Sequence, residues 1–226
     1  IIYYEIDENL IPDYDDIEKK INKNIKSILF VNYFGLPINI EQNVEFSKKN
    51  KLIMIEDNAH GFSGIFKNHY LGTFGDIGIS SPRKNHNIMS GGVLFLKNKK
   101  FLKEIKLNEI NKTLKWKLYE FMPIFLFNYF CLFLNFIKKK SKRKNKLIKK
   151  YNYNFNDNFK IDNNSKFILE HQNNKKLNII KREIFELWLQ FFNQINLQVI
   201  TLNNYDEFSP MCIAFKIQNI QFRINF

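Results

Sequence analysis

The stretch "IEDNAHGFSG" (residues 55–64) ends an apolar run on Asp57, and "ISSPRKNHNIMSGG" (residues 79–92) places Lys84 in a loop before Gly91 and Gly92. Asp57 follows one apolar run directly, and Lys84 lies a few residues beyond another. In a parallel sheet, ligands bind in the crevice beyond the carboxyl ends of the strands. We therefore expect the carboxylate of Asp57 and the amine of Lys84 to face one small space and to form a site.

Short apolar runs alternate with amphipathic segments over the first hundred residues, which predicts an α/β fold. One helix is expected to begin at Asp13, a good N-cap, and a second is expected to run from Asn39 to about Asn50. This alternation favours a mostly parallel sheet with flanking helices. A small hairpin is expected at 64–72, with His69 on the surface. The expected strands are residues 1–6, 27–34, 51–57, 77–81 and 92–98.

The rest of the chain predicts a smaller α+β domain at the carboxyl end. A helix is expected over residues 178–195, and its apolar side chains recur at helical spacing, which predicts that they pack in the core. These side chains are Ile180, Ile184, Leu187 and Phe191. Strands are expected at 197–202 and 211–217. The predicted parts are an incomplete large domain (1–110), a helical and basic, Asn-rich connection (111–164) and a partial small domain (165–226).

The positive charge of the chain is concentrated in one segment. The 226 residues are 45% hydrophobic, enough to bury a core, and carry a formal net charge of +13. Residues 138–150 supply nine basic side chains and no acidic one, so that without these nine charges the +13 falls to +4. A local charge run is usually solvated. The composition therefore argues against a surface that binds nucleic acid.

Cysteine usage and the apolar segments bear on the location of the protein. Cys131 and Cys212 lie in no metal-binding or redox spacing, which favours the reducing cytoplasm. The chain opens without a signal-peptide pattern, on a segment that reads as a strand, so we expect it to begin within a domain. Residues 118–137 are long and apolar enough to span a bilayer, but they contain Pro123 and several polar residues. Buried or interface helices are favoured, and membrane association through residues 118–150 is the alternative.

Asp57 and Lys84 fit the two side-chain roles that pyridoxal phosphate requires. A lysine in an enclosed site can form a Schiff base with the aldehyde of the cofactor. A carboxylate beside the ring nitrogen keeps that nitrogen protonated, which makes the ring an electron sink. Taken alone, the pair is weak evidence, because a loop lysine is usually a solvated charge and an aspartate at the end of a strand usually makes a turn or a cap.

The residues around Asp57 and Lys84 favour the interpretation that this pair binds pyridoxal phosphate. "IEDNAH", "LGTFGDIGISS", "RK" and "SGG" occur in an order that resembles the DegT/StrS family of pyridoxal-phosphate-dependent nucleotide-sugar aminotransferases, within the aspartate-aminotransferase fold type. That family carries an Asp-x-Ala-His/Gln element, a Gly-x-x-Gly-Asp approach to a strand, and a Ser-x-x-Lys element followed by Gly-Gly. "VNYFGLP" (residues 31–37) is also similar to the family. The resemblance covers roughly residues 1–98.

The resemblance implies a role for each site residue. Lys84 would form the internal aldimine and move the proton during transamination of a nucleotide-linked keto-sugar, with an amino acid as donor, as in surface polysaccharide or related sugar biosynthesis. Asp57 would pair with the pyridine nitrogen, and Ala59 would lie beneath the ring. His60 would lie near the phenolic oxygen, with a satisfied loop histidine as the alternative. Ser81 would bind the cofactor phosphate, although Ser80 competes for this role. A homodimer is implied for the complete protein, and no metal is implied.

The sequence also departs from the family pattern, and these departures leave a non-catalytic function as an alternative. Pro82 replaces an aromatic or aliphatic residue of the loop. The segment "YNYNF" (151–155) is faintly similar to the family's loop whose Asn reaches a partner's cofactor phosphate, which makes Asn152 a candidate for that Asn, but Asn154 stands where an Arg is usual. The upstream half of the family's large domain is absent, so we expect the isolated chain to transfer no amine. A non-catalytic fragment or remnant is the alternative function. A further alternative is a metal hydrolase that uses Asp57, His60, His69 or His86.

Overall fold

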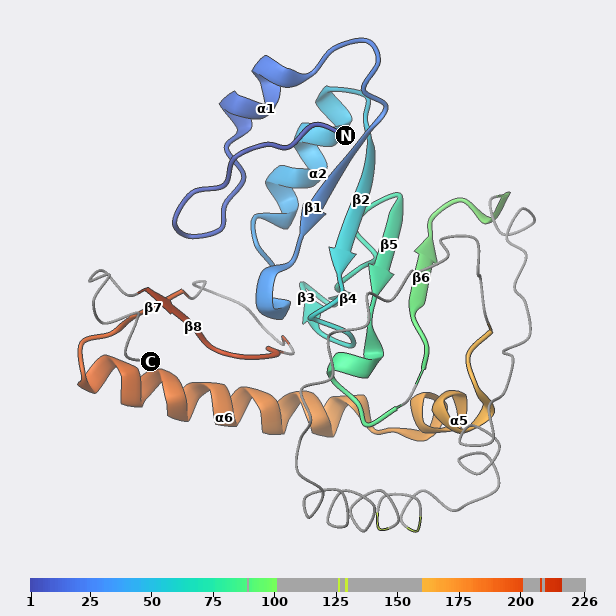
Figure 1. Ribbon diagram of the computed structural model, residues 1–226, viewed down its shortest axis with the longest axis vertical. Helices are drawn as coiled ribbons and strands as arrows, with labels where there is room; N and C mark the ends of the chain where they lie inside the picture. Colours follow the sequence, from blue (N-terminus) through green and yellow to red (C-terminus); the bar gives the residue numbers. More distant parts are fainter. Residues whose placement is uncertain are drawn as a thin grey trace, which may run out of the picture.

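A four-stranded sheet forms the centre of the amino-terminal half (Figure 1). The structure, a computed structural model, describes residues 1–88, 90–100, 126, 129, 160–200, 208 and 210–216. β2 pairs in parallel with β1 and β5, whereas β6 pairs antiparallel with β5. This mostly parallel sheet with its helices confirms the α/β prediction. The strands, in sheet order, are β1 (Ser27–Val31), β2 (Ile53–Asn58), β5 (Ile77–Ser80) and β6 (Val93–Leu96).

The three parallel strands end on the side of the sheet that faces α6 (Asn174–Gln194), as Figure 1 shows. Their register pairs Val31 with Asp57, and Asp57 with Ile79. Asn32, just beyond β1, donates its backbone N–H to the Asp57 carbonyl at 2.9 Å. Asp57 therefore lies at the carboxyl end of the sheet, where the sequence predicts a site.

Two helices cover one face of this sheet. α1 (Tyr14–Lys20) begins as expected at Asp13, whose side chain accepts the Asp16 N–H at 2.9 Å. α2 (Ile40–Lys49) begins after Asn39, but Asn39 has a left-handed backbone, and its side chain makes no capping hydrogen bond. Each buried apolar side chain of this layer contributes about 1.5–3 kcal/mol. The buried residues of this core cluster are Ile17, Ile28, Phe30, Phe46, Leu52 and Met54.

The opposite face of the sheet is apolar and exposed. Because side chains alternate along a strand, every second residue of each strand points to this face. Leu29 is 40% exposed, Ile53 44%, Ile79 36% and Leu94 46%. Parallel sheets are usually covered on both faces. The described residues cover only one face of this sheet.

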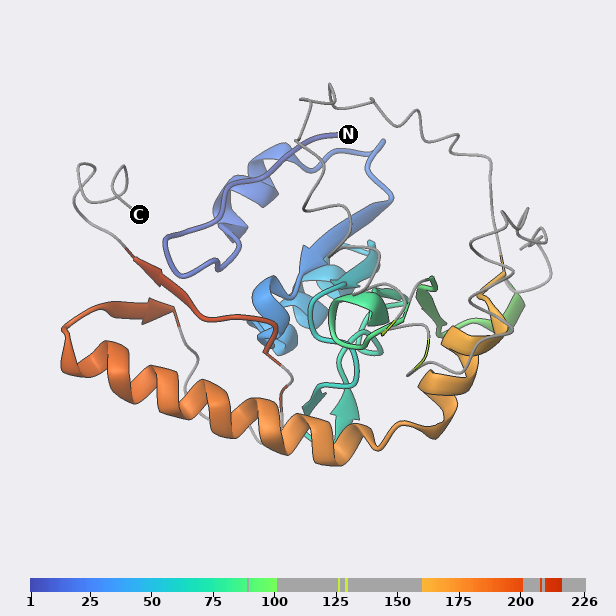
Figure 2. The same cartoon turned by 60° about the horizontal axis from the view of Figure 1, so that its bottom comes forward.

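The carboxyl-terminal elements pack beside the loop that follows β1. Figure 2 shows β7 (Gln198–Ile200) and β8 (Ala214–Lys216) beside the far half of α6, away from the larger sheet. α5 (Asn163–His171) precedes α6, and Asp162 caps it by accepting the Ser165 N–H at 2.8 Å. A second core cluster joins α6 to the loop near residue 36. Its buried members are Leu36, Ile38, Phe185 and Phe208.

A short hairpin lies between β2 and β5, as the sequence predicts. β3 (Ile65–Phe66) pairs antiparallel with β4 (His69–Tyr70). His69 is exposed, and its Nδ1 lies 2.9 Å from the Lys67 carbonyl oxygen. The surface position expected for His69 is confirmed.

The strand expected at residues 1–6 does not form. Only Ile6 pairs, in an isolated bridge with Pro12. The segment contacts β1 through a side chain instead, because the Tyr4 hydroxyl donates to the Leu29 carbonyl at 2.8 Å and its ring packs against Phe30. The apolar run was sufficient for contact with the sheet, but backbone pairing with β1 is absent.

The apolar stripe on α6 is exposed, so the prediction that it packs in the core is wrong. Ile180, Ile184, Leu187 and Phe191 have exposures of 42%, 50%, 65% and 47%. The buried residues of the helix are Asn178 and Phe185, which lie on another side. The periodicity therefore identified the helix correctly but not the face that the protein buries.

Several predicted features lie outside the described residues. These are Cys131, the basic run 138–150, Asn152 and most of the apolar stretch 118–137, of which only Leu126 and Tyr129 are described. Within the described residues, no helix has the length and apolar character needed to cross a bilayer.

Candidate functional site

Asp57 presents its carboxylate at the end of β2. The side chain is half-buried, and its Oδ1 accepts the Ala59 backbone N–H at 2.9 Å. This local turn fixes one carboxylate oxygen. Oδ2 makes no hydrogen bond within the described part of the chain. Oδ2 of Asp57 is therefore available to a ligand. Ala59 contributes to the site by donating its backbone N–H to Oδ1.

Lys84 lies in the loop that follows β5. It ends the short 3-10 helix η2 (Pro82–Lys84), and its backbone N–H donates to the Ser81 carbonyl at 3.0 Å. Pro82 is buried at the first position of η2, where its fixed φ suits a helical turn. The Lys84 side chain is exposed, and among the described residues its amine makes neither a hydrogen bond nor an ion pair. The loop is thus fixed through its backbone, while the amine is accessible.

The charges of both Asp57 and Lys84 act on His60. Its Nδ1 accepts the Phe34 backbone N–H at 3.1 Å, so the proton of the neutral ring is on Nε2. The imidazole stacks on the Phe34 ring with 6.1 Å between centroids. Burial lowers the pKa of His60, the Lys84 charge lowers it further, and the Asp57 carboxylate raises it. The structure therefore brings Asp57, His60 and Lys84 into one electrostatic neighbourhood.

A change at Lys84 should alter the titration of His60. In Lys84→Met, the loss of the positive charge is expected to raise the pKa of His60 relative to the unmodified protein, because the imidazolium form no longer faces a like charge. NMR titration of the histidine side chains measures this shift. Lys97→Met, which removes an exposed charge beyond β6, should leave the His60 pKa unchanged. An equal pKa in Lys84→Met and the unmodified protein would contradict this neighbourhood.

The two serines before Lys84 face opposite ways. Ser80 is buried, and its Oγ lies 3.3 Å from the Asn58 amide nitrogen, which donates to it. Ser81 is partly exposed, and its side chain makes no capping hydrogen bond to η2. Because neighbouring residues of a strand alternate between faces, only one of the pair can turn outward. Ser81 is the serine that remains accessible.

A buried carboxylate beneath the site was missed by the sequence analysis. Glu56 is 1% exposed, and four N–H groups donate to it. Its Oε1 accepts the Asn32 side-chain amide at 2.8 Å and the Gly72 N–H at 2.6 Å. Its Oε2 accepts the Phe74 N–H at 2.8 Å and the Gly75 N–H at 3.3 Å. Glu56 thus ties the loop before β5 to β2, immediately beside Asp57.

The Gly-x-x-Gly-Asp element serves this same loop. A Cβ at Gly78 would lie 1.6 Å from the Gly72 carbonyl oxygen, so only glycine permits this approach of the loop to β5. The Asp76 side chain accepts the Met54 N–H at 3.0 Å. These residues therefore position the strands.

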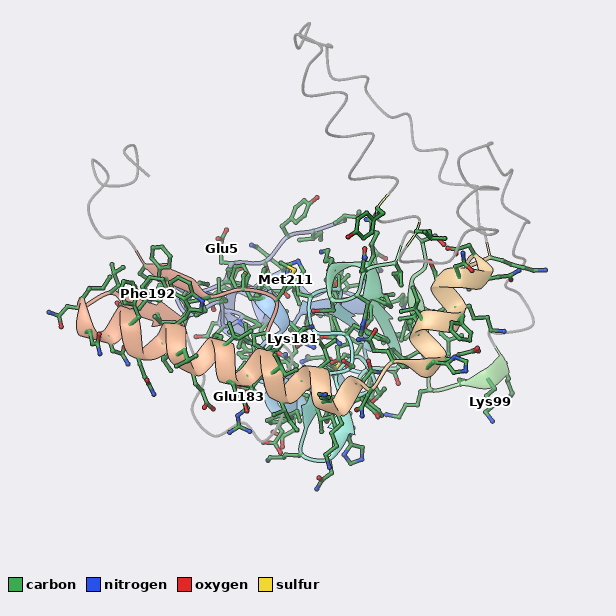
Figure 3. The ribbon with its side chains drawn as sticks, turned by 90° about the horizontal axis from the view of Figure 1, so that it is seen from below. Glu5, Lys99, Lys181, Glu183, Phe192 and Met211 are labelled. Atoms are coloured by element: carbon green, nitrogen blue, oxygen red, sulfur yellow. The ribbon has the colours of Figure 1, made fainter. Side chains whose placement is uncertain are left out.

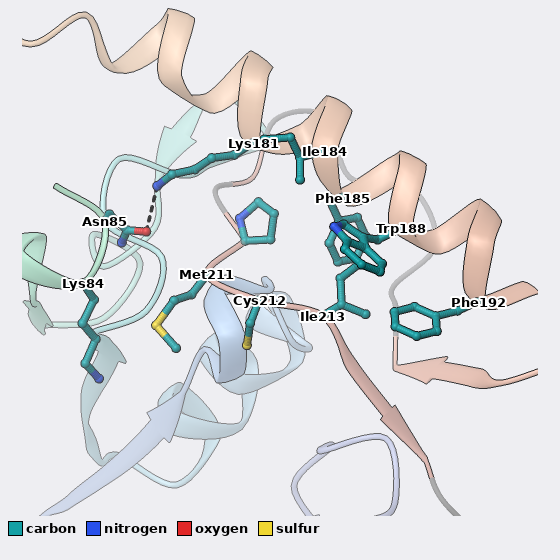
Figure 4. A pocket seen from close by; sticks show the side chains of 11 residues that line it. Lys84, Asn85, Lys181, Ile184, Phe185, Trp188, Phe192, Met211, Cys212 and Ile213 are labelled. Carbon is teal, nitrogen blue, oxygen red and sulfur yellow. Dashed lines mark hydrogen bonds between the residues drawn. The ribbon is translucent and has the colours of Figure 1, made fainter. Parts of the chain in front are cut away.

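A cavity of about 470 Å³ adjoins Lys84. It lies between Lys84 and the side of α6 (Figure 4). Figure 3 shows where two of its lining residues, Lys181 and Phe192, lie along α6. Lys181 of α6 donates to the Asn85 side-chain oxygen at 2.8 Å, and the Asn85 amide donates to the His60 carbonyl at 3.0 Å. Burial lowers the pKa of Lys181 to about 8. Lys181 and Asn85 were missed because only the fold brings α6 to this loop.

The side chains present fit pyridoxal phosphate better than a metal. A carboxylate with an available oxygen, an imidazole and an accessible amine occur together, which is the donor set that the cofactor requires. Across the described residues, His, Cys, Asp and Glu form no group of three that could hold a metal ion. His86, one of the candidate ligands, is buried against Phe62.

Sequence comparison identifies the family that the chain resembles. The sequence model of the DegT/DnrJ/EryC1/StrS aminotransferase family matches residues 1–207. The GDP-perosamine synthase of Escherichia coli O157:H7 is 42% identical over 88 residues, which are 38% of this chain and 24% of the synthase.

The fold is similar to that of two solved structures. One is the E. coli GDP-4-keto-6-deoxy-D-mannose-3-dehydratase with bound hydrated PLP, with a TM-score of 0.60, 19% identity, and coverage of 96% of this chain and 54% of the dehydratase. The other is a DegT DnrJ EryC1 StrS aminotransferase from Brucella abortus, with a TM-score of 0.59, 15% identity, and coverage of 98% and 54%. The chain spans about half of these structures, and its matched segment spans about a quarter of the curated relative.

Proposed function

The chain belongs to the DegT/DnrJ/EryC1/StrS aminotransferase family, and on this premise we propose that it serves the pyridoxal-phosphate-dependent transfer of an amino group to a nucleotide-linked keto-sugar. The observation that carries the proposal is the gathering of Asp57, His60 and Lys84 at the carboxyl ends of the parallel strands. Ligands of open α/β sheets bind at this place.

Each of the three side chains has a task that its surroundings support. Bound pyridoxal phosphate would supply an aldehyde and an electron-accepting ring. Asp57 would bind the protonated ring nitrogen through the carboxylate oxygen that Ala59 leaves available. Lys84 would hold the cofactor by its amine and would move the proton at that amine. His60, kept neutral by burial and by Lys84, would donate through Nε2, and Ser81 would bind the phosphate.

Relatives support a substrate class for the proposed reaction. The E. coli relative is named for GDP-perosamine, an amino sugar on a nucleotide. We extend this to a nucleotide-linked keto-sugar as acceptor and an amino acid as donor. The proposal includes a cytoplasmic homodimer that serves surface polysaccharide or related sugar biosynthesis.

Covalent trapping tests the proposal directly. The 226-residue chain is incubated with pyridoxal phosphate, reduced with borohydride, digested and mapped by mass spectrometry. We expect the reduced cofactor on Lys84, because its amine is accessible and lies near Asp57 and His60. Cofactor on another lysine, or labelling at random over the lysines of the chain, would refute the assignment. A remnant that binds no cofactor would show no specific labelling.

A further inference from the structure

The loop between Lys84 and β6 is joined to the start of α5 by a group of hydrogen bonds. The Ser90 hydroxyl donates to Oδ2 of Asp162, and the Asp162 backbone N–H donates to the same hydroxyl oxygen at 3.2 Å. The Ser90 backbone N–H donates to the Ser165 hydroxyl oxygen at 3.3 Å. Ser90 and Asp162 are 72 residues apart in the chain. We call this group, formed by Ser90, Asp162 and Ser165, the loop–helix contact.

The loop–helix contact is buried. Asp162 is 4% exposed, and Ser165 is fully buried. Oδ1 of Asp162 accepts the Ser165 N–H at 2.8 Å, so the loop and α5 each bind one oxygen of the carboxylate. Hydrogen bonds to a carboxylate are stronger than those between neutral groups, and a buried acceptor is costly to leave without its donor. The Ser90 hydroxyl is therefore the group that ties the loop to α5.

The backbone after Ser90 permits this close approach. Gly91 has a φ of +111°, in the region that favours glycine. A Cβ at Gly91 would lie 2.6 Å from Cδ1 of Ile161, the residue before Asp162. Any side chain at this position would therefore have to displace Ile161 or the loop itself. Gly91 thus serves the contact with α5 as well as the turn into β6.

The other end of the loop is held by α6. Lys181 donates to the side chain of Asn85, at the start of the loop, and Asn85 donates to the His60 carbonyl. α5 ends at His171 and α6 begins at Asn174, so only two residues separate the helices. Figure 1 shows α5 beside the loop that leads into β6, with α6 continuing from it. A displacement of α5 from the loop would therefore move the start of α6 and, with it, the contact at Asn85.

We propose that Ser90 and Asp162 are positioning residues for the Lys84 amine, because their contact holds the loop and the two helices in the arrangement that keeps Lys84 near His60. The role of Lys84 itself rests on the proposed function. Neither Ser90 nor Asp162 needs to touch the cofactor. Release of the loop from α5 would let the amine move away from the aldehyde that it must attack, and a misplacement of about 1 Å is enough to slow an enzymatic step strongly.

The pKa of His60 reports the position of the Lys84 charge in the absence of any cofactor. Burial lowers this pKa, and the Lys84 charge lowers it further. In Ser90→Ala, which changes no charge, we expect the pKa of His60 to rise toward its value in Lys84→Met, because the amine spends less time near the imidazole. NMR titration of the 226-residue chain measures this rise. Ser165→Ala should raise the pKa in the same direction, and Ser90→Thr, which keeps the hydroxyl, should retain the unmodified pKa.

A double variant separates positioning from a general loosening of the structure. Loosening would expose His60 to water and raise its pKa whether or not Lys84 carries a charge. In the Lys84→Met protein, adding Ser90→Ala should leave the His60 pKa unchanged, because Ser90 acts through Lys84. Ser47→Ala is the matched control: it removes a buried hydroxyl, which donates to the Asn43 carbonyl at 2.8 Å, and should not affect His60. An unchanged His60 pKa in Ser90→Ala, an equal rise with and without the Lys84 amine, or an equal effect of Ser47→Ala would each overturn the proposal.

Borohydride trapping is a second readout, and it separates this proposal from the proposed function. We expect the rate of specific trapping of pyridoxal phosphate on Lys84 to fall about tenfold in Ser90→Ala and to recover in Ser90→Thr. Specific trapping that is equally fast in Ser90→Ala and the unmodified chain would overturn the positioning role alone. A His60 pKa that depends on Ser90 through Lys84, in a chain without specific trapping, would refute the proposed chemistry and leave the positioning role standing.

Discussion

Lys84→Ala is expected to abolish the specific borohydride-trapped adduct of pyridoxal phosphate and the absorbance change that accompanies cofactor binding. The reason is chemical, because alanine has no amine with which to hold the aldehyde. The structure supports Lys84 for this role, since its amine is exposed, makes no hydrogen bond or ion pair with the described residues, and influences His60. Absorbance spectroscopy and peptide mapping of the reduced protein measure the loss.

Lys181 is the rival that this experiment must exclude. It lines the same cavity, and its lowered pKa of about 8 leaves more of its amine unprotonated near neutral pH than an ordinary lysine has. Lys181→Gln is therefore the matched control, and it should retain the adduct on Lys84. Loss of the adduct in Lys181→Gln together with its retention in Lys84→Ala would reassign the cofactor lysine to Lys181.

Glu56→Gln is expected to lower the free energy of unfolding by about 3 kcal/mol. Glutamine fits the same space, but its amide nitrogen is a donor that would face backbone N–H donors. In the unmodified protein, Oε1 of Glu56 accepts from Asn32 and Gly72, and Oε2 accepts from Phe74 and Gly75. Either orientation of the amide leaves buried N–H groups unsatisfied, at about 1–3 kcal/mol each. Denaturant unfolding followed by circular dichroism measures the change.

Glu45→Gln provides the comparison for Glu56. Glu45 is exposed on α2, so its replacement should change stability by less than about 0.5 kcal/mol. Glu56→Gln should also disturb Asp57, the next residue of β2, and so reduce cofactor trapping on Lys84. A Glu56→Gln protein as stable as Glu45→Gln would show that the loop before β5 does not depend on this carboxylate.

The sequence predicted the fold where a local pattern was enough. Alternating apolar runs and caps predicted four strands and the first two helices, and the hairpin at 65–70 followed from turn residues. Residues 1–6 also have the composition of a strand, but a strand requires a partner, and only Ile6 pairs. The prediction that the apolar stripe on α6 packs in the core was wrong for a related reason. Helical spacing identifies which side chains share a face but not what covers that face.

The candidate site was predictable in part, because Asp57, His60 and Lys84 lie in stretches with a recognisable order. Glu56 was not, since a single acidic residue within an apolar strand gives no sign that four N–H groups of distant loops surround it. The role of Lys181 could not be predicted from the sequence either. It lies almost a hundred residues from Asn85, and only the packing of α6 brings the two together.

The contacts of α6 differ along its length. The Asn178 side-chain amide donates to the Ser63 carbonyl at 2.7 Å, and Phe185 enters the core beside Leu36. Beyond Phe185, the Phe192 ring packs against Phe215 of β8, with ring centroids 5.0 Å apart. The Lys181 end of the cavity is therefore attached to the loops of the larger sheet, whereas the aromatic end, at Phe192, is attached to the small sheet of β7 and β8. Substitutions at the contact between Phe192 and Phe215 are thus expected to alter the aromatic end of the cavity without displacing Lys181.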